Sequence, residues 1–148
     1  MTSSLDIVLQ SSANIVVVGC AAVDITAQEF PNTDPVLAKH STAPGHVKFS
    51  LGGVARNVAE ATHRILESKS SKLSSILLAP VGKDPFGQTL LRELGSLGMR
   101  TDGLLEFEDE TSAVCNIVLE SDGTLVGGVA DMGINQRMTA DAVGLIIS

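Results

Sequence analysis

The chain has 148 residues, a net charge of −7 and only 3% aromatic residues, with neither Trp nor Tyr. An acidic surface repels phosphate backbones, and so few aromatic rings offer little surface for stacking, so we expect no nucleic-acid partner. No apolar run approaches the ~20 residues that a membrane span needs, and the N-terminus lacks a basic segment, so we expect a cytoplasmic protein with no membrane partner. The length suits one domain that buries roughly 68–70% of its unfolded surface.

The cysteines and histidines of this chain are too few and too scattered for a disulfide framework or a metal cluster. Cys20 follows a predicted strand and Cys115 lies in an apolar run, so both are predicted to be small buried hydrophobic residues. His40, His46 and His63 have no partner at metal-ligand spacing. We predict no metal site, and no nucleophile–base pair stands out as catalytic.

The first 13 residues are predicted to form an N-terminal tail. The β-branched run Ile15–Val18, closed by Gly19, is typical of a buried strand in a parallel sheet. Asp24 comes just past the carboxyl end of that strand, where open α/β sheets bind their ligands. Asp24 is therefore a candidate acceptor of hydrogen bonds from a polyhydroxylated substrate, with a structural turn acid as the alternative.

The next informative segment is the pair Gly52-Gly53, which precedes an apolar-periodic helix. Adjacent glycines let the backbone approach a ligand closely. Asn57 lies on the first turn of that helix, where free N–H groups attract ligand oxygens. The segment predicts a small-molecule site, with an ordinary turn and a helix-capping Asn57 as the alternatives. Arg56 is expected either to reach a phosphate or to be solvated.

A second strand and helix follow. Ser75–Ala79 is an apolar run, after which Asp84 is predicted to cap a helix that has Pro85 at its first position. The run 112–119 and the turn at 120–123 predict a hairpin. The segment 19–24 lacks the G-x-G-x-x-G pattern, so we exclude a dinucleotide site.

In order and spacing, these motifs resemble the PfkB-type carbohydrate and nucleoside kinases. The matching segments are 16–24, 52–57, 81–99 and 112–123. The resemblance implies an α/β ribokinase-like three-layer sandwich with a small β-sheet lid. Residues 14–148 would form its N-terminal part, with lid strands at about 21–28, 45–51 and 112–130. Within the family, Pro44–Ser50 and Asp131-Met132 are most similar to pseudouridine kinases.

The resemblance also implies a function and a set of site residues. Family members transfer phosphate from ATP to a hydroxymethyl group, here of a ribosyl substrate with pseudouridine as a candidate. A small-molecule sugar or nucleoside would be the partner, and a homodimer could form through the lid. The substrate-binding residues implied are Asp24, Gly52, Gly53, Asn57, Asn116 and Asp131. Ala22 stands where many relatives have Asn, a departure from ribokinase-type specificity.

One family motif is absent from this sequence. Relatives carry a Gly-Ala-Gly-Asp turn, whose amides hold the developing phosphate charge and whose Asp deprotonates the accepting hydroxyl. The chain ends at Gly144–Ser148, within an expected interior strand. We therefore expect no catalytic residue here, expect the ATP and Mg²⁺ sites in a missing C-terminal half, and expect this chain alone to be inactive. The alternative is a non-catalytic ligand-binding or dimerisation module derived from a kinase lid.

Overall fold

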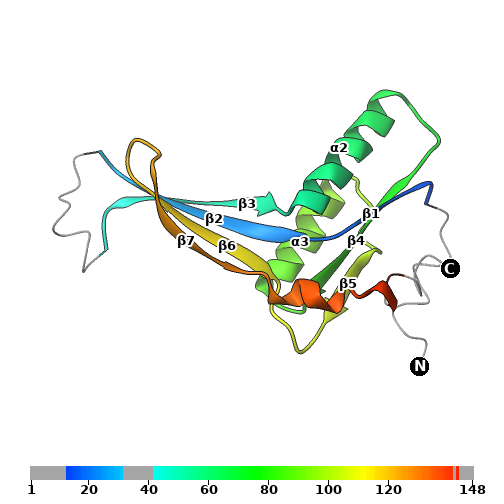
Figure 1. The fold of residues 1–148 in the computed structure, drawn as a ribbon. Helices are drawn as coiled ribbons and strands as arrows, with labels where there is room; N and C mark the ends of the chain where they lie inside the picture. Colours follow the sequence, from blue (N-terminus) through cyan, green and yellow to red (C-terminus); the bar gives the residue numbers. More distant parts are fainter. Residues whose placement is uncertain (1–12, 32–41, 142, 144–148) are drawn as a thin grey trace.

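The structure is a computed structural model that describes residues 13–31, 42–141 and 143. Two sheets are joined end to end, with the helices packed against one of them (Figure 1). The predicted tail, apart from residue 13, the segment 32–41 and the expected strand at 144–148 lie outside the described residues.

The first sheet is parallel and has the strand order β1-β4-β5. Its strands are β1 (Ile15–Val18), β4 (Ser75–Gly82) and β5 (Leu104–Phe107). Helices α2 (Val54–Ser68) and α3 (Pro85–Ser96) cover one face, where Leu77, Ala79 and Val81 of β4 are buried with Leu90 and Leu94 of α3. The short 3₁₀ helix η2 (Gly133–Arg137) lies near the other face, which carries Ile76 and Leu78.

The prediction that Ile15–Val18 is a buried strand is correct for the strand and its parallel pairing but wrong for burial. Val16 and Val18 are 42% and 43% exposed. Within the described residues β1 is an edge strand, and its Val16 and Val18 stay exposed although their neighbours on the same face of β4, Ile76 and Leu78, are buried. An apolar strand sequence indicates that both faces of the strand can be buried. Whether they are buried depends on the elements that pack against them.

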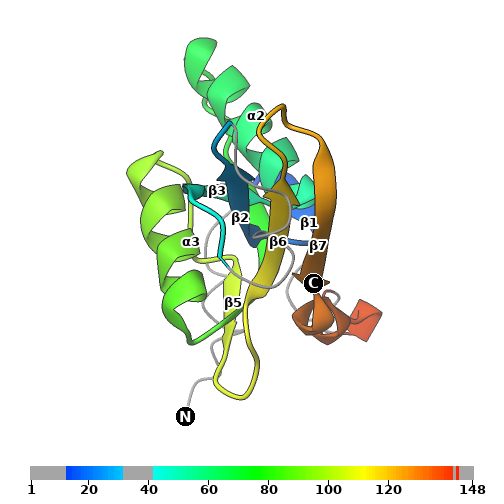
Figure 2. The ribbon, with the colours of Figure 1, turned by 90° about the vertical axis from the view of Figure 1, so that its left-hand side faces the viewer.

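The second sheet is the lid, with the strand order β3-β2-β6-β7. Its strands are β2 (Ala22–Glu29), β3 (Gly45–Gly52), β6 (Ala113–Leu119) and β7 (Leu125–Asp131). β2 runs antiparallel to β3 and parallel to β6, and β6 and β7 form the predicted hairpin. The lid projects away from the helices, and Figure 2 shows β3 and β7 at its two edges.

Asp84 ties the first sheet to the base of the lid. It is the N-cap of α3, as predicted, and accepts a hydrogen bond from the Gly87 N–H at 2.7 Å. The same carboxylate accepts from the N–H of Ser112 at 2.7 Å and from its hydroxyl at 2.8 Å. Burial raises the pKa of Asp84, but these hydrogen bonds outweigh that effect and hold it below its ordinary value. Ser112 directly precedes β6, so this contact fixes where the lid begins.

Candidate functional site

A pocket of about 740 Å³ lies where the carboxyl end of β1 meets the lid and the start of α2. This is the end of a parallel strand at which α/β proteins bind ligands. Its volume falls in the range of small-molecule sites. The polar side chains lining it are those of Asp24, Asn57 and Asn135, and the sulfur-containing ones are those of Cys20, Cys115 and Met132.

Asp24 faces this pocket from β2, in agreement with its place in the sequence. Neither carboxylate oxygen has a hydrogen-bond partner among the residues that the structure describes. Gly52 lies next to it on β3, and a Cβ atom at Gly52 would come within 2.2 Å of Asp24 Oδ2. Gly52 therefore makes room for the carboxylate, while the pocket itself is lined by Gly53.

Gly53 requires glycine because of both its conformation and its surroundings. Its φ is +93°, and a Cβ atom there would lie 2.4 Å from the carbonyl oxygen of Cys20. The same carbonyl accepts a hydrogen bond from the Arg56 N–H at 3.2 Å, so the loop after β1 packs closely on the start of α2. This close packing brings the backbone of Gly53 to the pocket wall.

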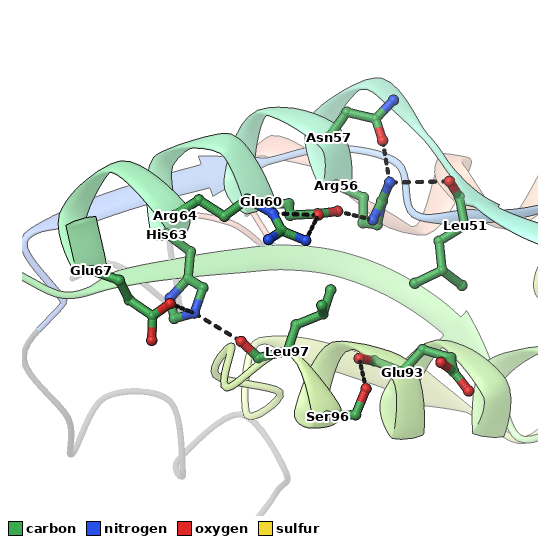
Figure 3. Close-up of polar contacts among 10 residues, drawn as sticks. All are labelled: Leu51, Arg56, Asn57, Glu60, His63, Arg64, Glu67, Glu93, Ser96 and Leu97. Atoms are coloured by element: carbon green, nitrogen blue, oxygen red, sulfur yellow. Dashed lines mark hydrogen bonds and ion pairs between the residues drawn. The ribbon is translucent and has the colours of Figure 1, made fainter.

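Asn57 is oriented by its neighbour Arg56 (Figure 3). The guanidinium of Arg56 is buried, pairs with Glu60, and donates to the carbonyl of Leu51 at 3.0 Å and to Asn57 Oδ1. Because Oδ1 accepts this bond, the Asn57 Nδ2 group is left to donate to a ligand. The prediction that Arg56 is solvated is wrong, because the side chain is buried, whereas its contact with a phosphate stays a prediction. Gly53 rather than Asn57 is the helix cap.

Glu60 links the side chains of Arg56 and Arg64 on α2. Its carboxylate also binds Arg64, at 2.6 Å. The hydrogen bond from Arg64 lowers the pKa of Glu60, burial opposes this, and the charges of Arg56 and Arg64 add to the lowering. Glu60 therefore stays ionised and keeps Arg56 in place beside Asn57.

The structure brings neither Asn116 nor Asp131 into this pocket. Asp24 lies opposite Cys115 in the β2–β6 register, which places Asn116 on the other face of the lid. Asp131, the last residue of β7, pairs with Val114 on that same face. There its carboxylate accepts hydrogen bonds from the Gly133 N–H and the Thr111 hydroxyl. The next residue, Met132, lines the pocket. A shift of one residue along a strand exchanges the two faces.

Cys20 and Cys115 are half-buried and line the pocket, so the prediction that both are buried core residues is wrong. Cys20 Sγ lies 4.0 Å from Met132 Sδ, and Asn135 Nδ2 donates to the carbonyl of Met132 at 3.1 Å. Sequence reasoning missed these four residues, because only the pairing of β6 with β2 brings them together. Within the described ranges, no group of three or more His, Cys, Asp or Glu residues is placed to hold a metal ion.

None of the helices in the part of the chain that the structure describes is both long and apolar enough to cross a membrane.

The fold agrees with the comparisons to known proteins. Residues 12–138 match the pfkB family carbohydrate kinases. The chain is 29% identical to pseudouridine kinase of Escherichia coli over 127 residues, which is 86% of this chain and 37% of that protein. It is 31% identical to pseudouridine kinase of Arabidopsis thaliana over 115 residues, covering 78% of this chain and 27% of that protein.

Among solved structures, ribokinase of Giardia lamblia superimposes with a TM-score of 0.69 at 22% identity, over 90% of this chain and 38% of that one. The predicted ribokinase-like α/β fold is therefore confirmed. The chain belongs to the PfkB family of carbohydrate kinases. It spans about a third of the length of the two curated relatives that it matches.

Proposed function

We propose that this chain forms the substrate-binding part of an ATP-dependent kinase that phosphorylates the hydroxymethyl group of a ribosyl compound. The observation that carries the proposal is the Asp24 carboxylate, which has no hydrogen-bond partner among the described residues and faces an open pocket beside Gly53 and Asn57. An ionised carboxylate only accepts hydrogen bonds, so its two oxygens suit a pair of neighbouring sugar hydroxyls. Asn57 Nδ2 then donates to a further sugar oxygen.

Pseudouridine is the substrate that we propose. Two curated relatives with about 30% identity carry that name, and the family match covers most of this chain. The pocket volume of about 740 Å³ suits a nucleoside as well as a smaller sugar.

The sequence holds no Gly-Ala-Gly-Asp turn, and the described residues form no metal-ligand cluster. We propose that both groups are bound by residues outside this sequence, and we assign no step of the phosphate transfer to the residues described here.

The test is Asp24→Ala in a longer protein that contains this chain. Loss of the carboxylate leaves two sugar hydroxyls unpaired in a lid-covered site. The decrease in kcat/KM for pseudouridine should therefore correspond to a loss of about 2–4 kcal/mol in transition-state stabilisation, while KM for ATP stays unchanged. The matched control is Asp122→Ala in the exposed β6–β7 turn, for which the change in kcat/KM should correspond to no more than about 0.5 kcal/mol. Equal effects from the two variants would refute the placement of the site.

A second candidate function is a dimerisation or ligand-binding module without catalysis. The observation that favours it is the outer face of the lid, the face opposite Asp24. There Val47, Phe49 and Val129 are 62%, 66% and 77% exposed. Asn116 lies in the same row as Phe49 and Val129, which suggests a role in this face rather than in the pocket. Exposed apolar patches of this kind mark protein interfaces, and a second copy of this chain is the proposed occupant.

A further inference from the structure

The pocket has two chemically different sides. Asp24 on β2 and Asn57 on α2 make one side polar. Cys115 pairs with Asp24 across β2 and β6 and so lies beside it on the same face of the lid, and with Cys20 and Met132 it makes the sulfur-containing side. The sulfur atoms of Cys20 and Met132 are 4.0 Å apart, so the two side chains form one continuous surface.

The sulfur-lined side, defined as Cys20, Cys115 and Met132, is poorly suited to a sugar hydroxyl. Thiols and thioethers are weak hydrogen-bond partners, so a hydroxyl placed against them loses its bonds to water without replacement. A flat heteroaromatic ring carries no hydroxyl on its faces and gains contact with polarisable sulfur. A nucleoside carries both kinds of group in one molecule, a polar ribose and a flat base.

We infer that the sulfur-lined side packs against the base of a nucleoside and that these three residues make the pocket select a nucleoside over a free pentose. The inference rests on the proposed function, because it takes the ribose to lie against Asp24. Asn135 holds the sulfur-lined side in place, since its Nδ2 and its backbone N–H both donate to the carbonyl of Met132, at 3.1 and 3.2 Å. It is a positioning residue for Met132.

The chain carries its own probe of this contact, because its two cysteines both line the pocket. Alkylation by iodoacetamide is followed at each cysteine by mass spectrometry on the folded chain, with binding measured separately by calorimetry. Saturating pseudouridine should slow the alkylation of Cys115 by about 5-fold or more, and saturating ribose by less than about 2-fold. Calorimetric binding of pseudouridine with unchanged alkylation of both thiols overturns the inference and leaves the proposed function standing. Absence of any nucleoside binding overturns both.

Variants give a second, independent measurement in a longer, active protein. Met132→Ala should lower the ratio of kcat/KM for pseudouridine to that for ribose by about 10-fold, and Cys115→Ala by about 3-fold, because the loss falls on the base alone. The matched control is Met138→Ala, a methionine that packs against Ile76 and Leu78 on the far side of β4, and it should leave the ratio within about 2-fold.

Asp24→Ala separates the two ideas, since it should lower activity toward pseudouridine and ribose by similar factors. An unchanged ratio in both Met132→Ala and Cys115→Ala, together with loss of activity in Asp24→Ala, overturns the inference alone.

Discussion

The contact between Asp84 and Ser112 can be tested by its contribution to the free energy of unfolding. Asp84→Ala removes the acceptor for three donors: the Gly87 N–H, the Ser112 N–H and the Ser112 hydroxyl. Ser112 is almost completely buried, and its hydroxyl also accepts from the Gly82 N–H at 2.9 Å. Water therefore has little room to replace the lost carboxylate.

The magnitude follows from these contacts. Loss of a helix N-cap costs about 1 kcal/mol. Each hydrogen bond to a charged group contributes about 1.5–3 kcal/mol, and bonds that share one acceptor are not additive. We expect Asp84→Ala to lower the free energy of unfolding by about 3 kcal/mol, measured by urea denaturation with far-UV circular dichroism.

The matched control is Asp122→Ala. Like Asp84, Asp122 accepts a hydrogen bond from a nearby backbone N–H, that of Thr124 at 2.8 Å. Unlike Asp84, it lies in an exposed turn. The expected loss there is within about 0.5 kcal/mol. A loss below about 1 kcal/mol for Asp84→Ala, or equal losses for both variants, would show that the contact at the lid base is not stabilising.

The same contact predicts a dependence on pH. Burial raises the pKa of Asp84, yet the hydrogen bonds from Gly87 and Ser112 keep it below the ordinary 3.8. A group with a lowered folded pKa stabilises the protein above its unfolded pKa, and this contribution is lost as the pH falls through the folded pKa. The stability difference between the wild type and Asp84→Ala should therefore be constant near neutrality and shrink below about pH 4. A constant difference down to pH 2 would contradict this reasoning.

Two further variants address the pocket wall and the outer face. Arg56→Leu leaves the Leu51 carbonyl without its guanidinium partner, leaves Glu60 paired with Arg64 alone and frees Asn57 to rotate. We therefore expect a loss of about 2 kcal/mol in the free energy of unfolding, measured by urea denaturation, and a raised KM for the sugar substrate. A normal KM would show that Arg56 does not position Asn57. Phe49→Glu places a charge in the outer face of the lid and should convert a dimer to a monomer in sedimentation equilibrium. A wild-type chain that is monomeric at high concentration would rule out the dimer.

The secondary structure of this chain was largely predictable because its signals are local. Asp84 and Pro85 define the start of α3 through a hydrogen bond and a backbone angle confined to a few residues. Gly53 precedes α2 because its positive φ and the nearby Cys20 carbonyl exclude a side chain. The turn of the β6–β7 hairpin, where Gly123 also has positive φ, is likewise encoded within a few residues.

By itself, the sequence determined β1, β4, α2 and α3 in their order, the glycine-framed start of α2 and the presence of an acid shortly after β1, but it did not predict β5 or η2. The tertiary structure decided what each side chain faces. The register of β6 against β2 turns Cys115 toward Asp24 and Asn116 away from it. The packing of α2 buries Arg56 against Glu60 and Asn57. These outcomes depend on residues far apart in the chain, and because strand neighbours alternate between faces, a register shift of a single residue would have reversed the assignment on β6.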